Sequence, residues 1–319
     1  MRLIDLHCDT IWMLMREKDT KLQRNPFCVD VEKLKRAGGM VQFFACFIYL
    51  NEIVDDDRWE QGYWLALDMI KRGKAEFTAC SDEISLASNY DDVIKNQASG
   101  KVSAILTIEE GGILNNDLNR LYELYNQGIR LITLTWNYEN CIGYPNSREE
   151  IVMQKGLKPF GVEVIEKMNE LGMIIDVSHL SDGGFWDVMK YSKKPVVASH
   201  SNARSLCNHP RNLSDEMIEA LADKGGITGI NLYPYFINKN GKATVEDIAD
   251  HIWHMYQTGG EDFVALGTDF DGFDEGELEI AHIGEMEKLY DAVMRRGVTH
   301  RQMEKFWSGN AIRVMKQIF

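Results

Sequence analysis

Short apolar runs alternate with longer amphipathic segments along the whole chain, and this alternation constrains the fold more than any other feature. Runs such as Met173-Ile174-Ile175 are apolar on both faces, which is typical of a parallel sheet covered on each side. Strands are predicted at Arg2–His7, Val41–Tyr49, Ser103–Glu109, Arg130–Thr135, Met173–Ser178, Pro195–Ser199, Gly226–Asn231 and Phe263–Gly267. Such strict strand–helix alternation predicts an α/β fold, a TIM-like (β/α)₈ barrel rather than an open doubly wound sheet.

A single domain spanning residues 1–319 is the expected organisation. α/β barrels commonly occupy roughly 200 to over 400 residues as one unit, so the length does not require a second domain. The chain has no internal repeat, no linker rich in Pro, Gly or Ser, and none of the glycine motifs of nucleotide-binding open sheets. Between the strands, Pro159–Leu171 is predicted to be a helix, and Ser214 is predicted to cap the N-terminus of another.

The composition excludes several classes of partner. Thirty-five basic and 49 acidic side chains give a net charge of −14, which repels nucleic acid and anionic membrane surfaces. The longest apolar run, Phe43–Leu50, is too short to span a bilayer, and no secretion signal is visible. The six cysteines form no C-x-x-C pair, which indicates free thiols in a reducing compartment. We therefore expect a cytoplasmic protein, with the acidic stretches Asp55–Asp57 and Asp271–Glu279 as solvated loops; its oligomeric state, a homodimer included, stays open.

Residue types that bind metals occur where the predicted strands end, and barrel enzymes build their active sites there. His7 and Asp9 follow the first strand, and the period of two places both side chains on one side. A hydrogen-bonded structural pair explains them equally well. Glu110 follows the third strand before two glycines, and a carboxylate can bridge two cations, although a plain turn is the alternative. Glu109 is expected to point to the opposite face of the strand.

Two histidines end consecutive predicted strands, His179 after the fifth and His200 after the sixth. A lone histidine at a strand end is more often structural, but two of only eight in this arrangement favour a metal site. Neutral imidazole is a good zinc ligand, and its second nitrogen needs an orienting acceptor. Asp176 and Ser199 are near in sequence, but the sequence assigns this role to neither.

Two further charged residues lie beyond strand ends. Asp269, after the last strand, is suited to take a proton from water and pass it to a leaving amine. An Asp-Gly turn explains the nearby Asp271 but leaves Asp269 unexplained. Arg211 follows the sixth strand and is suited to clamp a substrate carboxylate through two hydrogen bonds, although a surface arginine is the alternative.

Taken together, these pieces resemble the renal (membrane) dipeptidase family of zinc peptidases, a branch of the amidohydrolase-like barrels. The similarity runs from Asp5 to nearly the C-terminus, and the ordered set is far more specific than any single piece. The matching stretches are Asp5–Asp9, Ile108–Gly112, Leu131–Thr135, Gly156–Gly161, Ile174–Ser181, Ser199–Ala203, Pro210–Asp215 and Gly267–Gly272.

The resemblance implies two Zn²⁺ ions per chain and a small dipeptide substrate. Its implied metal ligands are His7 and Asp9 for one ion, His179 and His200 for the other, and Glu110 as the bridge between them. The other implied roles are proton transfer by Asp269 and binding of the substrate's free carboxylate by Arg211.

One position departs from the family pattern. Family members commonly place a histidine after the L-T-L-T strand to stabilise the tetrahedral intermediate, and this chain has Trp136 there. An indole donates one N–H but cannot act as an imidazolium. Trp136 and Asn137 are therefore predicted to contact the substrate, with Asn137 or Tyr138 as a substitute donor.

The predicted function is hydrolysis of dipeptides, including those with a C-terminal D-residue, by a two-zinc centre. One alternative is hydrolysis of another amide, lactam or lactone by the same centre. A different alternative is a barrel that retains the metals but only binds ligand, with Trp136 marking lost catalysis. The intact Asp269 argues against that last interpretation.

Overall fold

The computed structural model confirms the barrel and describes residues 1–53 and 57–319. Most of the predicted acidic loop at Asp55–Asp57 lies outside the described residues. The barrel strands are β1 (Leu3–Asp5), β2 (Gly39–Phe47), β4 (Val102–Glu109), β5 (Ile129–Thr133), β6 (Ile174–Asp176), β7 (Val197–Ala198), β8 (Ile227–Ile230) and β10 (Val264–Leu266). All pair in parallel in the order β2-β1-β10-β8-β7-β6-β5-β4, and the pairing of β2 with β4 closes the cylinder. Each strand lies within or beside one of the predicted runs.

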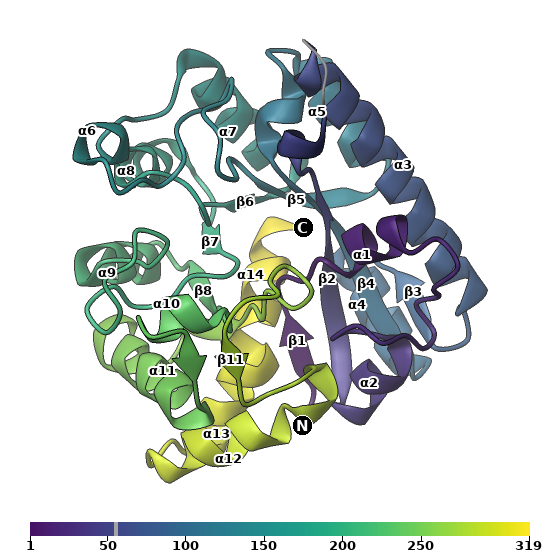
Figure 1. Ribbon diagram of the computed structural model, residues 1–319, viewed down its shortest axis with the longest axis vertical. Coiled ribbons are helices and arrows are strands. Elements are labelled where there is room, and N and C mark those ends of the chain that lie inside the picture. The colour runs from purple at the N-terminus through teal and green to yellow at the C-terminus, as the bar shows by residue number, and fades with distance from the viewer. Residues whose placement is uncertain (54–56) are drawn as a thin grey trace.

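Helices surround this cylinder, as Figure 1 shows. They are α1 (Thr10–Arg16), α2 (Val31–Arg36), α3 (Arg58–Ala79), α4 (Tyr90–Ala98), α5 (Leu118–Asn126), α6 (Glu150–Met153), α7 (Pro159–Leu171), α8 (Asp182–Tyr191), α9 (Asp215–Asp223), α10 (Pro234–Ile237), α11 (Val245–Gly259), α12 (Glu287–Arg295), α13 (His300–Glu304) and α14 (Asn310–Ile318). The predicted helix Pro159–Leu171 matches α7, and Ser214 caps α9 by accepting a hydrogen bond from the backbone N–H of Met217.

Apolar side chains fill the interior of the barrel at the end where the strands begin. Every one of the eight strands contributes to one buried cluster, for example Ile4 from β1 and Ile105 from β4, and α14 packs Val314 and Ile318 against it. A larger cluster fills the space between strands and helices and contains the alternate residues, such as Ile108. Because this end is closed, the open mouth of the barrel is at the other end, where the strands have their carboxyl ends.

The prediction that Asp271–Glu279 is a solvated loop is partly wrong. Asp271 accepts hydrogen bonds from the Thr10 hydroxyl at 2.6 Å and from the backbone N–H of Cys28 at 2.7 Å. It therefore ties the loop after β10 to the segments beside β1. Farther along, β11 (Glu277–Leu278) pairs with β9 (Lys242–Ala243), and a further strand, β3 (Ile84–Leu86), extends the sheet beside β4.

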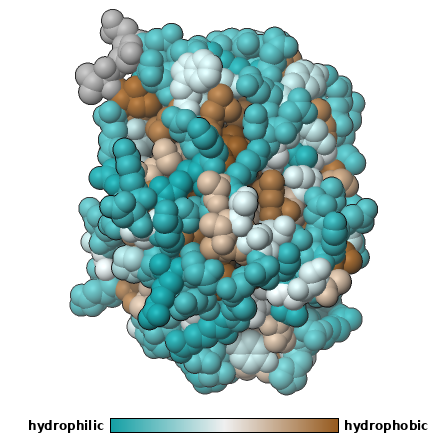
Figure 2. Space-filling view, turned by 90° about the vertical axis from the view of Figure 1, so that its right-hand side faces the viewer, coloured by the Kyte–Doolittle hydropathy of each residue, from teal (hydrophilic) through white to brown (hydrophobic). Residues whose placement is uncertain are grey.

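One face of the molecule is shown in a space-filling view in Figure 2. On the face drawn in Figure 2, hydrophilic residues cover most of the area and hydrophobic residues form small separate groups. Within the described ranges 1–53 and 57–319, no helix combines the length and apolar character needed to cross a bilayer.

Candidate metal centre

The structure brings four of the five predicted ligands together at the mouth of the barrel. His7 and Asp9 follow β1, His179 follows β6, and His200 follows β7, so all come from the carboxyl ends of strands. Their side chains are buried, with exposed fractions between 0% for His200 and 8% for His179. Asp269 follows β10, which lies three strands from β6 around the cylinder. Strand order alone thus assembles residues that are up to 262 positions apart in the chain.

Glu109, and not Glu110, is the carboxylate that faces this cluster, so the prediction of Glu110 as the bridging residue is wrong. β4 continues to Glu109, and a residue four positions after Ile105 lies on the same face of a strand. Since Ile105 points into the barrel, Glu109 does too. Glu110 follows the strand with φ 104°, which turns its side chain away from the barrel axis.

The two carboxylate oxygens of Glu109 face two different groups of side chains. Oε2 lies 3.4 Å from Nε2 of His7, which in turn lies 3.3 Å from Oδ2 of Asp9. Oε1 lies 3.1 Å from Nε2 of His179 and 3.5 Å from Nε2 of His200. One carboxylate therefore stands between an oxygen-rich group and a pair of imidazole nitrogens.

The histidine pair has the protonation state that a cation requires. Burial, with Arg211 nearby, lowers the pKa of His179 to about 3, and burial likewise holds the pKa of His200 well below its usual range. Both rings are therefore neutral near pH 7. Their Nε2 atoms face each other at 3.1 Å.

The other nitrogen of each ring is held by a neighbouring side chain. Nδ1 of His200 lies 2.7 Å from the Ser199 hydroxyl, which donates to Asp176 at 2.6 Å. Nδ1 of His179 lies 3.2 Å from the side-chain oxygen of Asn137, an acceptor, so this nitrogen carries the proton. The lone pair of Nε2 in His179 is thus left pointing into the cluster. Such orienting partners are typical of metal-binding histidines.

The other group also fits a cation. Oδ1 of Asp9 is buried without a hydrogen-bond partner among the described residues, which is costly for a carboxylate unless something else satisfies it. Burial opposes ionisation of Glu109, but His7 and His179 outweigh it and hold the pKa of that carboxyl below its usual range. Buried carboxylates and neutral imidazoles converging within a few ångströms are the donor set of a zinc site.

Glu110 has a structural position instead. Its Oε1 accepts hydrogen bonds from the backbone N–H of Gly112 at 2.8 Å and from the Asn140 amide at 2.5 Å. Its Oε2 accepts from the backbone N–H of Trp136 at 3.1 Å. Burial raises the pKa of Glu110 to about 7 despite these bonds. The residue fastens the loop after β5 to the end of β4.

Asp269 lies against the oxygen-rich group in a constrained conformation. Its φ of 60° is in the left-handed region, which few residues other than glycine adopt. The Asn231 amide donates to Oδ2 at 2.9 Å, and Oδ1 lies 3.7 Å from Nε2 of His7. Burial raises the pKa of Asp269 to about 6. One oxygen is thus anchored and the other faces the cluster.

Arg211 is buried and not a surface arginine. Its guanidinium donates to the Ser201 hydroxyl and to the carbonyl oxygen of His200, both at a long 3.4 Å, and it stacks 5.3 Å from the Phe236 ring centroid. No carboxylate among the described residues lies within ion-pairing distance of it, and its Nε has no hydrogen-bond partner there. A buried cation with weak contacts leaves hydrogen-bonding capacity for an anionic ligand.

A pocket of about 480 Å³ opens over the cluster. Trp136 and Asn137, the two residues predicted to contact the substrate, line it together with Glu109, His179 and Asp269. Its remaining walls are mostly aromatic and come from Trp12, Phe47, Tyr49, Tyr233, Phe236 and Phe273. A pocket of this size takes a molecule of dipeptide dimensions.

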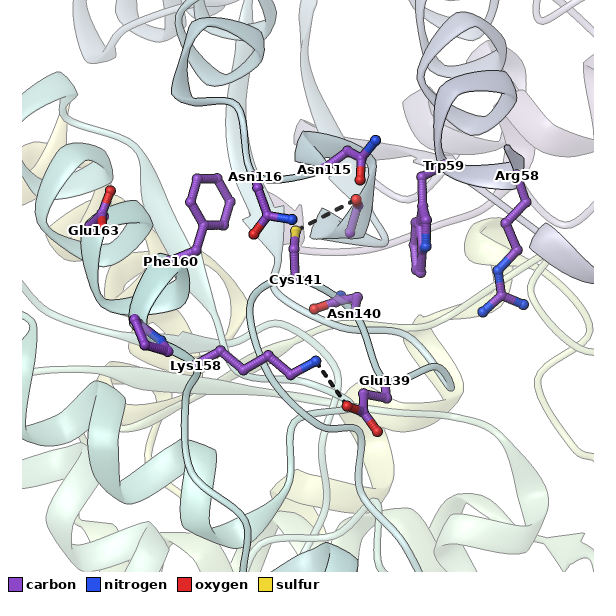
Figure 3. Close-up of a pocket in the computed structure, with 12 residues that line it drawn as sticks. Arg58, Trp59, Asn115, Asn116, Glu139, Asn140, Cys141, Lys158, Phe160 and Glu163 are labelled. Carbon is purple, nitrogen blue, oxygen red and sulfur yellow. Dashed lines mark hydrogen bonds and ion pairs between the residues drawn. The ribbon is translucent and has the colours of Figure 1, made fainter. Parts of the chain in front are cut away.

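A second pocket, of about 900 Å³, lies beside the Glu110 network and is drawn in Figure 3. Asn140 connects the two regions, because it lines this pocket and donates to Glu110. Figure 3 also shows Lys158 paired with Glu139 at 2.9 Å. Among its described lining residues there is none of the candidate metal ligands, whereas Asp9, Glu109 and His179 line the smaller pocket.

Comparisons with known proteins agree over the full length. Residues 1–319 match the family model described as membrane dipeptidase (peptidase family M19). A protein of Schizosaccharomyces pombe named as an uncharacterized dipeptidase is 31% identical, over 99% of this chain and 80% of its own length.

Solved structures share the fold. That of the dipeptidase AC, a metallopeptidase of family M19, superimposes with a TM-score of 0.90 at 24% identity, covering 100% of this chain and 98% of that one. A metallopeptidase from Rhodobacter sphaeroides, solved with a phosphinate mimic of the dipeptide L-Ala-D-Ala, also has a TM-score of 0.90 at 23% identity, covering 100% and 99%. These likenesses confirm the barrel.

Proposed function

The chain belongs to the membrane dipeptidase family, and on that premise we propose that it hydrolyses dipeptides with two zinc ions held at the barrel mouth. His7 and Asp9 would hold one ion with Oε2 of Glu109. His179 and His200 would hold the other with Oε1 of Glu109. The observation that carries this proposal is the division of the Glu109 oxygens between the two groups.

Bound zinc polarises a carbonyl group and makes water more acidic, so that water attacks a peptide bond at neutral pH. The side chains of this protein supply the rest. Oδ1 of Asp269 faces the cluster while Asn231 holds Oδ2, so the free oxygen is placed to accept the proton of the attacking water. The same oxygen then delivers the proton to the departing amine.

The first prediction concerns metal content. Protein purified without chelator should contain two zinc ions per chain by elemental analysis. Chelator should lower the melting temperature and added zinc should restore it, since a ligand at a thousand times its Kd stabilises by about 4 kcal/mol. A stoichiometry that stays below one after zinc is added back would contradict the two-metal centre.

The second prediction concerns Arg211 and the substrate carboxylate. A guanidinium pairs with a carboxylate through two parallel hydrogen bonds, which fixes the chain end relative to the metals. Removing one partner of such a buried pair costs about 2 kcal/mol or more, or roughly 30-fold in kcat/KM. We expect a loss of that size when the C-terminus of a dipeptide is amidated.

Arg211→Lys keeps the positive charge but loses the planar guanidinium that makes two parallel hydrogen bonds. It should lower kcat/KM for free dipeptides and change that for amidated ones far less, because the latter never used the contact. The measurement is kcat/KM for both substrates with both proteins. Equal cleavage of free and amidated dipeptides by the wild type would rule out the clamp and direct the search to other amides, lactams or lactones.

A further inference from the structure

Four aromatic rings form one side of the pocket over the metal centre, and the proposed hydrolysis does not by itself require them. They are Trp12 on α1, Phe47 at the end of β2, Tyr49 just after it, and Trp136 after β5. The ring centroids lie 5.7 Å apart for Trp12 and Phe47, 4.9 Å for Phe47 and Trp136, and 5.5 Å for Tyr49 and Trp136. These four rings are called the aromatic wall below.

The part of the aromatic wall that follows β2 lies across the barrel from Arg211, while Trp136 follows β5, two steps from β7. Around the closed cylinder, β2 and β7 are separated by four steps in either direction. Phe47 ends β2, and Arg211 belongs to the loop after β7 and contacts the carbonyl oxygen of His200. The metal centre lies between them because its ligands come from the strands on both sides.

This arrangement fixes the direction of a bound dipeptide. If the C-terminal carboxylate pairs with Arg211 and the peptide bond lies at the metal centre, the first residue extends toward the aromatic wall. Arg211 is not itself among the described residues that line the pocket, but it stacks on Phe236, which is. No other arginine and no lysine is among the described lining residues, while Asp274 and Glu275 add negative charge. The rings offer apolar surface, which favours apolar side chains, and their faces carry negative potential, which disfavours acidic ones.

Resting on the proposed dipeptidase function, we infer that the aromatic wall binds the side chain of the first residue of the substrate. The protein is therefore selective for dipeptides that begin with a large apolar or aromatic residue. Trp136 has a defined use here: its indole is part of the specificity surface, while its backbone N–H holds Glu110.

The test compares kcat/KM of the zinc-loaded protein for Phe-Ala, Leu-Ala, Ala-Ala, Gly-Ala and Asp-Ala. Filling an apolar pocket with even one methylene changes kcat/KM by about 10-fold or more, so we expect Phe-Ala and Leu-Ala to exceed Gly-Ala by at least that factor. Asp-Ala should be the poorest substrate. Equal values across the panel, or a preference for Gly-Ala or Asp-Ala, would overturn the inference.

Variants separate specificity from structure. Tyr49→Ala and Trp136→Ala should each reduce the ratio of kcat/KM for Phe-Ala to that for Gly-Ala, because only the larger side chain uses the wall. Trp64→Ala is the matched control: Trp64 is 54% exposed on α3, is not among the residues that line this pocket, and should leave the ratio unchanged. If Tyr49→Ala and Trp136→Ala lower all substrates equally, the wall does not select.

Ala-Ala distinguishes the two levels of the proposal. Hydrolysis of Ala-Ala without any preference across the panel would leave the proposed function standing and overturn the role of the wall. Failure to cleave any of the five dipeptides would overturn the proposed function, and the selectivity with it.

Discussion

Glu109→Gln should remove most of the activity and at least one zinc ion per chain. The two oxygens of Glu109 face the two groups of ligands, and an amide nitrogen in place of one oxygen is a donor that cannot bind a cation. Loss of a metal that supplies several kcal/mol of transition-state stabilisation should lower kcat by ~10³-fold or more. The measurements are zinc content after dialysis and kcat for a dipeptide that the wild type cleaves.

Glu110→Gln is the matched control, one residue away and equally buried. The amide places a donor against either the N–H of Trp136 or the donors of Gly112 and Asn140, so it should cost about 1–3 kcal/mol of folding stability. Zinc content should stay at the wild-type level. If instead Glu110→Gln loses zinc and Glu109→Gln keeps it, the assignment of the two carboxylates must be reversed.

The strands and the position of the site follow from the sequence, because both depend on short-range patterns. Apolar runs of four to eight residues are recognisable alone, and the carboxyl ends of parallel strands meet wherever the strands pair. His7, His179 and His200 could therefore be placed in one mouth without knowing any distance. The register that closes β2 onto β4 is a long-range property and was not predictable in the same way.

The incorrect assignment of the bridging role to Glu110, where the structure places Glu109, has a local cause. The predicted strand and β4 both end at Glu109, but every residue of β4 is buried, so the pattern of an apolar run did not show which of its two faces points into the barrel. The sequence held one usable signal: the polar residues of β4, which are Ser103, Thr107 and Glu109, all lie on the same face as Ile105. A polar residue near the end of an inward face marks the change from packed core to open mouth.

The side chains that orient the histidine rings could not be assigned from sequence patterns alone. Ser199 and Asp176 were near enough in sequence to be considered, yet only the pairing of β6 with β7 brings the Asp176 carboxylate to the Ser199 hydroxyl. Asn137 was predicted to contact the substrate, and the structure places it in the pocket but also in contact with Nδ1 of His179. Its role combines both contacts.

Asp269→Asn should leave both zinc ions and the fold in place while lowering kcat by ~10²–10⁴-fold, the range for loss of a general acid–base group. The replacement has the same shape, and its side-chain oxygen can still accept the hydrogen bond from Asn231. What it loses is the ability to take a proton on the atom that faces the metal centre.

The pH dependence follows from the same residue. A carboxyl acts as a base only when ionised, so kcat/KM should fall as pH decreases through its pKa. Burial raises that pKa to about 6, and bound cations would lower it, so the acidic limb of the wild-type profile should lie at or below pH 6. The Asp269→Asn variant should lack this acidic limb of the pH profile and should also have a lower kcat. Near-normal turnover by a variant with full zinc content would exclude Asp269 from proton transfer, and another group lining the pocket would have to carry the proton.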